Sequence, residues 1–290
     1  MKLLLLFISL LYYFDVSAGT SISVTDDEKN TVIFSQPPNR IISLSPHATE
    51  LLFAAGASDQ VVGTVSYSDF PPEAKKIPRI GSYNKIDLES VLKINPDLIV
   101  AWKGGGSEHQ IDDLKKLGFK IYYSEPKSFE EVATNIMNFG LILGTSEEAQ
   151  FRANKFLSEL ALLRNKFSGL KKVTVFYQVW NQPLMTINND HLITDVIELC
   201  GGSNVYGELS IRAPKVNIES VIQKNPQTII IGTSEQRQDW LSSWDHWQVI
   251  DAVKNKHVYA VNADFIVRQG PRILQGAKLI CEILEKVRVN

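Results

Sequence analysis

One pattern occurs twice in this chain of 290 residues, once in each half. The first copy reads DLESVLKINPDLIV, from Asp87 to Val100, and the second reads NIESVIQKNPQTIII, from Asn217 to Ile231. In each copy, Asp or Asn can cap a short helix, and the proline of the Asn-Pro pair ends that helix. The aliphatic run that follows is typical of a strand covered on both faces of a parallel sheet. The repeat therefore predicts two similar α/β lobes.

The remaining segments alternate between strand-like and helix-like patterns in both halves. A hairpin is predicted first, in ISVTDDEKNTVIF, because apolar and polar residues alternate around a polar turn. Short apolar runs then alternate with segments that begin at capping residues and end at glycines, the order of parallel βαβ units. We expect strands at 40–44, 60–67, 98–102, 119–124, 171–180, 228–233 and 257–261, and helices at 45–56, 107–118, 128–144, 192–200 and 271–287.

The segment TSEEAQFRANKFLSELALLRNKFSG is predicted to be one long helix that joins the lobes. Thr145 and Glu148 match a capping box, and no glycine or proline interrupts the segment before Gly169. Apolar residues recur at helical spacing at 149, 153, 156, 157, 160, 163 and 167. We expect a signal peptide at 1–18, a hairpin segment at 19–38, an N-terminal lobe at 39–144, the connecting helix at 145–168 and a C-terminal lobe at 169–290.

The first residues differ from the rest of the chain. MKLLLLFISLLYYFDVSAGT has a basic residue at Lys2, an apolar run short of the roughly 20 residues that a membrane span needs, and small residues before Ala18. This layout is typical of a cleaved secretory signal peptide, with a membrane anchor as the alternative. The whole chain is near charge balance, at −2, and lacks Lys/Arg-rich runs, so we expect no nucleic-acid partner and no further membrane span.

Export bears on the two cysteines, Cys200 and Cys281, which both lie in the second half of the chain. In an oxidising compartment an even number of cysteines favours a disulfide. Closing a loop of this length stabilises a fold by roughly 4 kcal/mol in the chain-entropy model. We predict the bridge, with two buried free thiols as the alternative.

Motifs that would indicate an enzyme are missing from the sequence. It has no phosphate-binding P-loop and no nucleophile elbow, and its GGGSE segment lacks the spacing of a dinucleotide-binding loop. The five histidines, at 47, 109, 191, 246 and 257, do not have the spacing of a metal site. We expect them at surface or loop positions, with His47 on the cleft side. We therefore predict a protein that is not an enzyme, with no metal and no cofactor of its own.

Aromatic residues gather where the predicted strands end. Ligands of parallel α/β sheets bind at the carboxyl ends of the strands, and aromatic rings there could line a pocket for a large, flat, partly apolar ligand. The candidates are Tyr67, Tyr83, Trp102, Trp180 and Phe265, with packing inside their own lobe as the alternative. A tryptophan-rich segment, 239–247, is expected to be a helix that packs on its lobe, and 262–270 is expected to be a loop.

Glu89 and Glu219 occupy the same position in the two copies of the repeat. A carboxylate in the first turn of a helix is favoured by the helix dipole, so helix stabilisation is the simplest interpretation. Because each lobe contributes one of these carboxylates, the pair could also dock on a two-fold symmetric partner that carries cations.

Several motifs, in order along the chain, resemble one known family. RIISLSPHATELLFAAG, SYSDFPPEAKKI, DLESVLKINPDLIVAWKGG, LCGGSNVY and DFIVRQGPRI are similar to segments of cobalamin-binding members of the iron-siderophore and cobalamin-binding family of periplasmic proteins. The resemblance runs from roughly Arg40 to the C-terminus. It implies a class III periplasmic binding protein: two Rossmann-like lobes with central parallel sheets, one long rigid connecting helix, and a ligand cleft between the lobes. It also implies a periplasmic receptor that delivers cobalamin (vitamin B12) or a related corrinoid to the permease dimer of an ABC importer with its ATPase subunits.

The resemblance implies roles for particular residues. Tyr67 matches a tyrosine that contacts the corrin ring, and the binding loop of the second lobe corresponds to Asp264, Phe265, Ile266, Val267 and Arg268. Glu89 and Glu219 match a pair that docks on permease arginines. Cys200 and Cys281 match the family's disulfide.

The pocket implied by the resemblance is altered in this chain. Its binding loop is poorer in aromatic residues, and two tryptophans of the family's pocket correspond to Tyr83 and Ala213. A ferric siderophore or haem receptor of the same family is therefore the alternative function. Anionic siderophores favour paired basic residues, and Arg268 is the one clear candidate in the loops.

Overall fold

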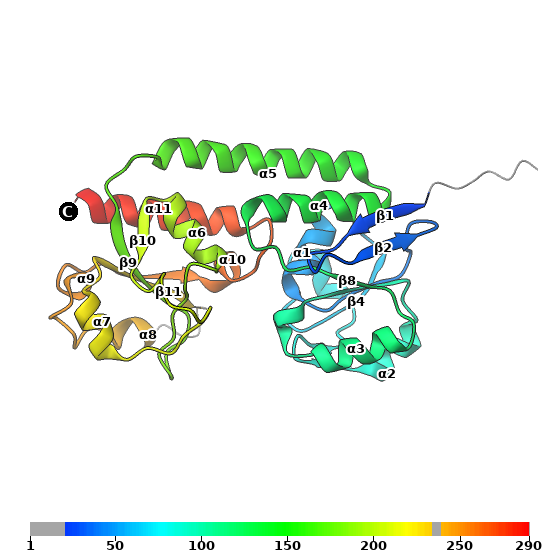
Figure 1. The fold of residues 1–290 in the computed structure, drawn as a ribbon, viewed down its shortest axis with the longest axis horizontal. Helices are drawn as coiled ribbons and strands as arrows, with labels where there is room; N and C mark the ends of the chain where they lie inside the picture. The colour runs from blue at the N-terminus through cyan, green and yellow to red at the C-terminus, as the bar shows by residue number, and fades with distance from the viewer. Residues whose placement is uncertain (1–20, 234–238, 290) are drawn as a thin grey trace, which may run out of the picture.

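The computed structural model describes residues 21–233 and 239–289, and it shows two α/β lobes side by side beneath one long helix (Figure 1). The predicted signal peptide, 1–18, lies outside the described residues. The expected hairpin is confirmed: β1 (Ile22–Thr25) pairs antiparallel with β2 (Thr31–Phe34), and β1 packs against the first lobe. Within the two described ranges, no helix is both long enough and apolar enough to cross a membrane.

The first lobe is built on a four-stranded sheet in the order β4-β3-β7-β8, and all its strand pairs are parallel. The apolar strands predicted from the sequence form the buried centre of this lobe. Its elements are β3 (Ile41–Ser43), α1 (Pro46–Ala54), β4 (Val61–Thr64), η1 (Pro72–Lys76), β5 (Gly81–Ser82), β6 (Lys85–Ile86), α2 (Leu88–Ile94), β7 (Leu98–Ala101), η2 (Lys103–Gly105), α3 (Glu108–Lys116), β8 (Ile121–Tyr123) and α4 (Phe129–Leu143).

The second lobe repeats this plan with a parallel sheet in the order β10-β9-β11-β12. Two lobes with central parallel sheets confirm the predicted fold class. The elements of this lobe are β9 (Val173–Gln178), α6 (Leu192–Leu199), β10 (Gly202–Asn204), α7 (Ile218–Lys224), β11 (Thr228–Thr233), α8 (Asp239–Ser242), α9 (Asp251–Lys254), β12 (Val258–Asn262), α10 (Ala263–Ile266) and α11 (Ile273–Val289).

Two local predictions for the second lobe were wrong, and the strand β10 was missed. β10 was not expected, because Gly-Ser-Asn has low strand propensity and its strand forms only by pairing with β9. The segment predicted as a loop contains α10, which begins where the Asn262 side chain accepts a hydrogen bond from the Asp264 N–H, 2.9 Å away. The tryptophan-rich segment forms only the short helix α8, although Trp240 and Trp244 are buried in the lobe core as expected.

The repeated pattern encodes one local geometry in both lobes. Oδ1 of Asp87 accepts a hydrogen bond from the N–H of Ser90 at 3.2 Å, and Oδ1 of Asn217 accepts one from the N–H of Ser220 at 2.9 Å. At the other end of each helix an asparagine adopts the left-handed conformation, with φ of 49° at 95 and 40° at 225. Asparagine tolerates this conformation and the proline that follows cannot continue a helix. The repeat therefore specifies where each helix begins and where it ends.

Helix α5 (Ser146–Phe167) spans both lobes and packs on α4 and α11 (Figure 1). Six residues of its predicted stripe are buried: 149, 153, 156, 160, 163 and 167. Around them one continuous hydrophobic core runs from the first lobe into the second, while each sheet has a separate core on its other face. The predicted capping box does not form. Thr145 instead donates its hydroxyl to the Ala55 carbonyl, and Glu148 pairs with Arg152.

The predicted disulfide is present. Cys200, at the end of α6, is joined to Cys281 on α11, across a sequence separation of 81 residues. Both residues are buried, so the bridge ties the last helix to the interior of the second lobe.

Salt bridges centred on Glu50 tie the two lobes together near the cleft. Glu50 lies on α1 of the first lobe, and its side chain is only 1% exposed. It accepts hydrogen bonds from Arg272 Nε at 2.9 Å and Arg272 Nη2 at 2.6 Å, and from Arg268 Nη1 at 3.2 Å. Both arginines belong to the second lobe, and the Arg272 guanidinium also lies 4.2 Å from the ring centroid of Phe70 in the first. The network fixes how the lobes meet.

We predict that Glu50→Gln lowers the free energy of unfolding by about 3 kcal/mol, because the substitution leaves two arginines in a site with little access to water. Urea denaturation of the mature chain measures this change. Glu159→Gln is the matched control, since Glu159 pairs with Lys278 on the exposed surface and should change stability by less than about 1 kcal/mol. Equal, small effects of both substitutions would contradict the structural role of Glu50.

Candidate functional site

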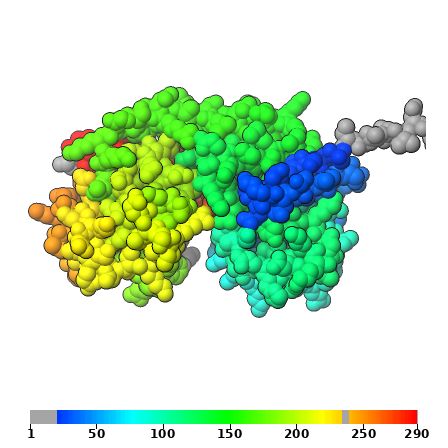
Figure 2. Space-filling view, in the orientation of Figure 1, coloured from blue at the N-terminus to red at the C-terminus, as the bar shows by residue number. Residues whose placement is uncertain are grey.

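A cavity of about 520 Å³ lies between the lobes and is lined from both sides. Figure 2 shows the molecule hollowed between the lobes on the side away from α5. The lining residues follow the carboxyl ends of strands in each sheet, where ligands of parallel α/β sheets bind. They are Pro46, His47, Tyr67, Tyr83, Trp102, Gly104, Glu125, Val179, His191, Ile193, Arg212, Ala213, Asp264, Val267, Arg268 and Gln269.

Aromatic rings form the wall of the first lobe. Trp102, directly after β7, lies with its ring 6.3 Å from that of Tyr83 and meets the His47 ring edge-on at 5.6 Å. Gly105 makes this arrangement compatible with the loop, because a Cβ there would lie 2.9 Å from the Tyr83 carbonyl oxygen and 3.2 Å from the Trp102 ring. The short glycine run thus lets the loop pack closely against Tyr83 and Trp102.

Tyr67 is presented to the cavity by an uncommon backbone conformation. Its φ is +67°, in the left-handed region that non-glycine residues seldom adopt. The residue is 69% exposed, although the neighbouring Val65 and Ser68 are buried. Backbone strain of this kind is found where the surrounding structure holds a residue for a function. The turn after β4 therefore holds an aromatic ring out into the cleft.

The second lobe contributes four aliphatic side chains to the cavity, beside its polar and charged ones. Val179 follows β9, Ile193 is in the first turn of α6, Ala213 precedes α7, and Val267 follows α10. Aromatic rings on one side and aliphatic side chains on the other would hold a flat, partly apolar ligand by burial of apolar surface, at about 25 cal/mol per Å².

The structure brings six of the nine predicted ligand-binding residues to the cavity: Tyr67, Tyr83, Trp102, Asp264, Val267 and Arg268. The other three lie outside its lining. Trp180 packs edge-on against Trp240, with ring centroids 5.5 Å apart. Ile266 is 1% exposed and belongs to the lobe core, so its side chain cannot reach a ligand. Phe265 has its ring 5.3 Å from the Arg272 guanidinium.

The expectation that the histidines lie at surface or loop positions was wrong for His47, which is buried in α1 on the cleft side, whereas His191 and His257 are at loop positions. His257 is buried beside Tyr259, and His47 and His191 line the cavity. Burial lowers the pKa of His47 to about 4, against the opposing effects of the Ser124 carbonyl, which accepts from its Nε2 at 2.9 Å, and of Glu125. Burial, assisted by the charge of Arg212, lowers the pKa of His191 to about 4. Both histidines are therefore neutral at pH 7.

The charged residues of the cleft are paired across it. Arg212 Nη1 lies 2.8 Å from Glu125 Oε1 of the other lobe. Arg268 contacts Asp69 at 2.7 Å in addition to Glu50, and Asp264 of its own lobe at 2.9 Å. Burial would raise the pKa of Asp69, but the hydrogen bond and charge of Arg268 outweigh it and hold that pKa below its ordinary value.

The residues that sequence reasoning missed are Glu50, Glu125, Arg212 and Arg272. Only Glu50 carried a local signal, because it is the one charged residue in the apolar helix HATELLFAAG. In the sequence, Glu125, Arg212 and Arg272 look like ordinary charged residues of loops or helices. Their pairing depends on how the two lobes are placed together.

Glu89 and Glu219 are both exposed, in the first turns of α2 and α7. Figure 1 places these helices on the same side of the molecule, one on each lobe and opposite α5. The two helices that carry these glutamates thus lie on the side where the molecule is hollowed in Figure 2.

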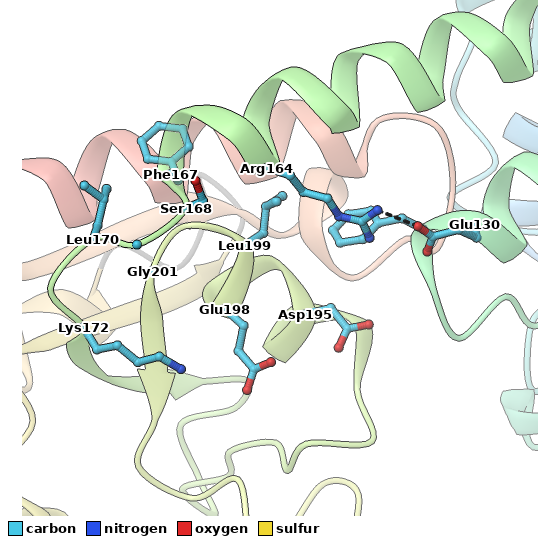
Figure 3. A pocket seen from close by; sticks show the side chains of 12 residues that line it. Glu130, Arg164, Phe167, Ser168, Leu170, Lys172, Asp195, Glu198, Leu199 and Gly201 are labelled. Carbon is cyan, nitrogen blue, oxygen red and sulfur yellow. Dashed lines mark hydrogen bonds and ion pairs between the residues drawn. The ribbon is translucent and has the colours of Figure 1, made fainter.

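A second cavity, of about 550 Å³, lies under the C-terminal half of α5 (Figure 3). Arg164 and Glu130 form an ion pair at 2.7 Å across it, and Asp195 and Glu198 point into it from α6. It lies away from the carboxyl ends of both sheets and exposes few aromatic rings. In the described part of the chain, no three His, Cys, Asp or Glu residues are grouped to hold a metal ion.

Comparison with known proteins agrees with this geometry. Residues 41–265 match the model of a family described as periplasmic binding protein. The vitamin B12-binding protein of Vibrio cholerae is 37% identical over 250 residues, which are 86% of this chain and 90% of the relative. The crystal structure of the periplasmic vitamin B12 binding protein BtuF of Vibrio cholerae superposes with a TM-score of 0.81 at 35% identity, covering 88% of this chain and 99% of that one. A protein of Staphylococcus epidermidis described as a possible iron-binding (periplasmic solute-binding) protein is 26% identical, with a TM-score of 0.75 and coverage of 86% and 99%.

We predict that His47 and His191 each lower the stability of the folded chain as the pH falls from 6.5 toward 4. Over this range the unfolded chain protonates the histidines at 47 and 191, whose pKa is ordinarily 6.5, while the folded chain keeps them neutral down to about 4. Each then costs on the order of 3 kcal/mol. Urea denaturation at several pH values measures the slope. His47→Gln should flatten it, whereas substitution of the exposed His246 by Gln should not.

Proposed function

Since this chain belongs to the periplasmic binding protein family, we propose that it captures cobalamin or a related corrinoid in the cleft and delivers it to the permease of an ABC importer. The observation that carries the proposal is the cavity with an aromatic wall and an aliphatic wall at the carboxyl ends of both sheets. A corrin ring is a large, nearly flat macrocycle with apolar faces and an amide-rich edge, which suits such walls. The vitamin B12-binding relative in Vibrio cholerae supports this ligand class.

Different residues of the cavity would contact different parts of the ligand. Tyr67, Tyr83 and Trp102 would contact the faces and edge of the macrocycle, and Val267 with Ala213 would close on it from the second lobe. The family tryptophan that Ala213 replaces leaves space in this wall, which a ligand substituent could occupy. Polar groups at the rim, such as Gln269, could hydrogen-bond the peripheral amides. The role is binding without catalysis, and cobalamin is cargo, not a cofactor.

The lobes, 39–144 and 169–290, would move little on binding. The segment 145–168 is helical over most of its length, and the core beneath it is continuous from one lobe to the other. Two networks of salt bridges also cross the cleft. Pre-organisation of this kind reduces the cost of ordering the site when the ligand binds.

Delivery would take place in the periplasm of a Gram-negative cell. The sequence features of 1–18 support export through a cleaved signal peptide, and a buried disulfide suits an oxidising compartment. Glu89 and Glu219 would dock on cations of the permease dimer, because one carboxylate from each lobe matches the two-fold symmetry of such a partner. The ATPase subunits would act on the far side of the membrane.

A ferric siderophore or haem receptor is the second candidate, supported by the relative described as possible iron-binding. The cleft provides little free positive charge for such anionic ligands, because the two guanidiniums that line its cavity are already paired with carboxylates.

We predict that the mature chain binds one cyanocobalamin per molecule, and that Tyr67→Ala weakens binding by roughly 10-fold through loss of an aromatic contact. Isothermal titration calorimetry measures both. Phe151→Ala removes an equally exposed aromatic ring from α5, outside the cleft, and should leave the affinity unchanged. Binding of a ferric siderophore or haem in place of cyanocobalamin would support the siderophore or haem receptor and contradict the corrinoid receptor.

We predict that the double substitution Glu89→Lys/Glu219→Lys weakens docking of the loaded protein on its permease by at least 10-fold, because it opposes like charges. Binding to the permease in lipid nanodiscs measures docking, and calorimetry checks that the ligand is still bound. The double substitution Glu147→Lys/Glu282→Lys makes the same change of net charge at exposed positions of α5 and α11. If that control weakened docking as much as Glu89→Lys/Glu219→Lys does, the effect would come from net charge instead of these two sites.

A further inference from the structure

We infer that the carboxylates of the cleft select the ligand by charge: Glu125, Asp69 and Asp264 keep the guanidiniums that line the cavity paired, so that the site accepts a neutral corrinoid and rejects an anionic ligand. This inference rests on the proposed function and adds to it the property by which the cleft discriminates among large, flat ligands. A fold that also serves iron-binding relatives needs such a property.

The first pair is formed by Arg212 and Glu125. Arg212 lines the cavity from the second lobe, and its Nη1 donates to Glu125 Oε1 of the first lobe at 2.8 Å. The Glu125 side chain is 10% exposed, and its own backbone N–H donates to Asp27 Oδ2 at 2.6 Å. Because the carboxylate is shielded from water while the Arg212 side chain is 37% exposed, salt screens the pair only in part. An incoming anion would meet a guanidinium that is already neutralised.

The second guanidinium, that of Arg268, is paired more completely. It contacts Asp69 at 2.7 Å, Asp264 at 2.9 Å and Glu50 at 3.2 Å. Burial opposes its charge, but the carboxylates outweigh burial and raise the pKa of Arg268 above its ordinary value. Arg268 therefore stays charged, and its guanidinium stays paired with carboxylates of the protein. The sequence made it the natural anion site, and its contacts remove it from that role.

The histidines add no positive charge. His47 and His191 are neutral at pH 7, and His191 Nδ1 accepts a hydrogen bond from the N–H of Ile193 at 3.2 Å, as a neutral ring can. Among the described residues at the cleft, the carboxylates of Glu50, Asp69, Glu125 and Asp264 face the guanidiniums of Arg212, Arg268 and Arg272. The lining itself carries two carboxylates, those of Glu125 and Asp264, and two guanidiniums, those of Arg212 and Arg268, so it offers an anion no net positive charge.

An anionic ligand could bind only by displacing one of these carboxylates. The displaced group would remain in the cleft as an unpaired charge with restricted access to water, which is costly. Like charges placed together at an interface disfavour the wrong partner in the same way. A neutral ligand displaces none of the pairs and still buries its apolar faces against the two walls.

The test uses ligands that differ by a single charge. Cyanocobalamin is neutral, and hydrolysis of one peripheral propionamide gives a monocarboxylic acid with the same ring and nearly the same size. The three monocarboxylate isomers are titrated separately by calorimetry at pH 7.5. For each protein, the ratio of the monocarboxylate Kd to the cyanocobalamin Kd measures discrimination, independently of any general loss of affinity.

We expect the wild-type chain to bind the monocarboxylates at least 10-fold more weakly than cyanocobalamin. Glu125→Gln, which frees the Arg212 guanidinium, should reduce this ratio by at least 5-fold for one or more isomers. Glu125→Asp keeps the charge and should keep the discrimination. Glu130→Gln breaks a pair of the same type, with Arg164 at 2.7 Å, outside the cleft and should leave the ratio unchanged.

Equal binding of neutral and anionic ligands by the wild-type chain would overturn charge selection while the receptor function stood. Charge selection would also be overturned if Glu125→Gln left the ratio of the monocarboxylate Kd to the cyanocobalamin Kd unaltered. Should that variant fail to fold, the double substitution Asp69→Asn/Asp264→Asn makes the test at Arg268, because it removes two of the three carboxylates that contact this guanidinium. Absence of cyanocobalamin binding by the wild-type chain would overturn the proposed function, and the inference with it.

Discussion

The buried carboxylate of Glu50 is the interaction on which the arrangement of the two lobes depends. It lies on the first lobe and accepts hydrogen bonds from Arg268 and Arg272 of the second. Removing a carboxylate and two guanidiniums from water is costly, and only close, well-directed contacts compensate for it. The network therefore tolerates one relative position of the lobes, and the same position brings the aromatic and aliphatic walls into opposition.

The long helix α5 and the core beneath it support the same position from the other side. A core shared by both lobes cannot be divided without exposing apolar surface, so a wide hinge opening would cost free energy that a loop-linked pair of lobes does not lose. We expect a cleft that is largely formed before the ligand arrives. In such a receptor, the surface that the permease would recognise hardly changes when the ligand binds. This surface would include the repeated helix of each lobe, α2 and α7.

The function follows from the walls of the cleft and not from the fold, because the same fold is shared with a relative described as possible iron-binding. The first lobe supplies rings at Tyr67, Tyr83 and Trp102, and the second supplies aliphatic side chains. The ionisable groups around them are paired or neutral. The shape and the apolar contacts of the cleft suit a large macrocycle. The pairing of its charged groups favours neutral macrocycles over anionic ones.

The sequence by itself determined the lobes, most helix limits and the connecting helix. A capping Asp87, a left-handed Asn95 before a proline and a stripe of apolar residues act over one or two helical turns, so their neighbours in sequence are enough to reveal them. Only the tertiary structure decided which strand-end aromatic residue lines the cleft: Tyr67 does, while Trp180 packs on Trp240. It also decided the pairing of Glu50 and Glu125 with arginines far along the chain. Such contacts depend on how two lobes dock, which no local pattern records.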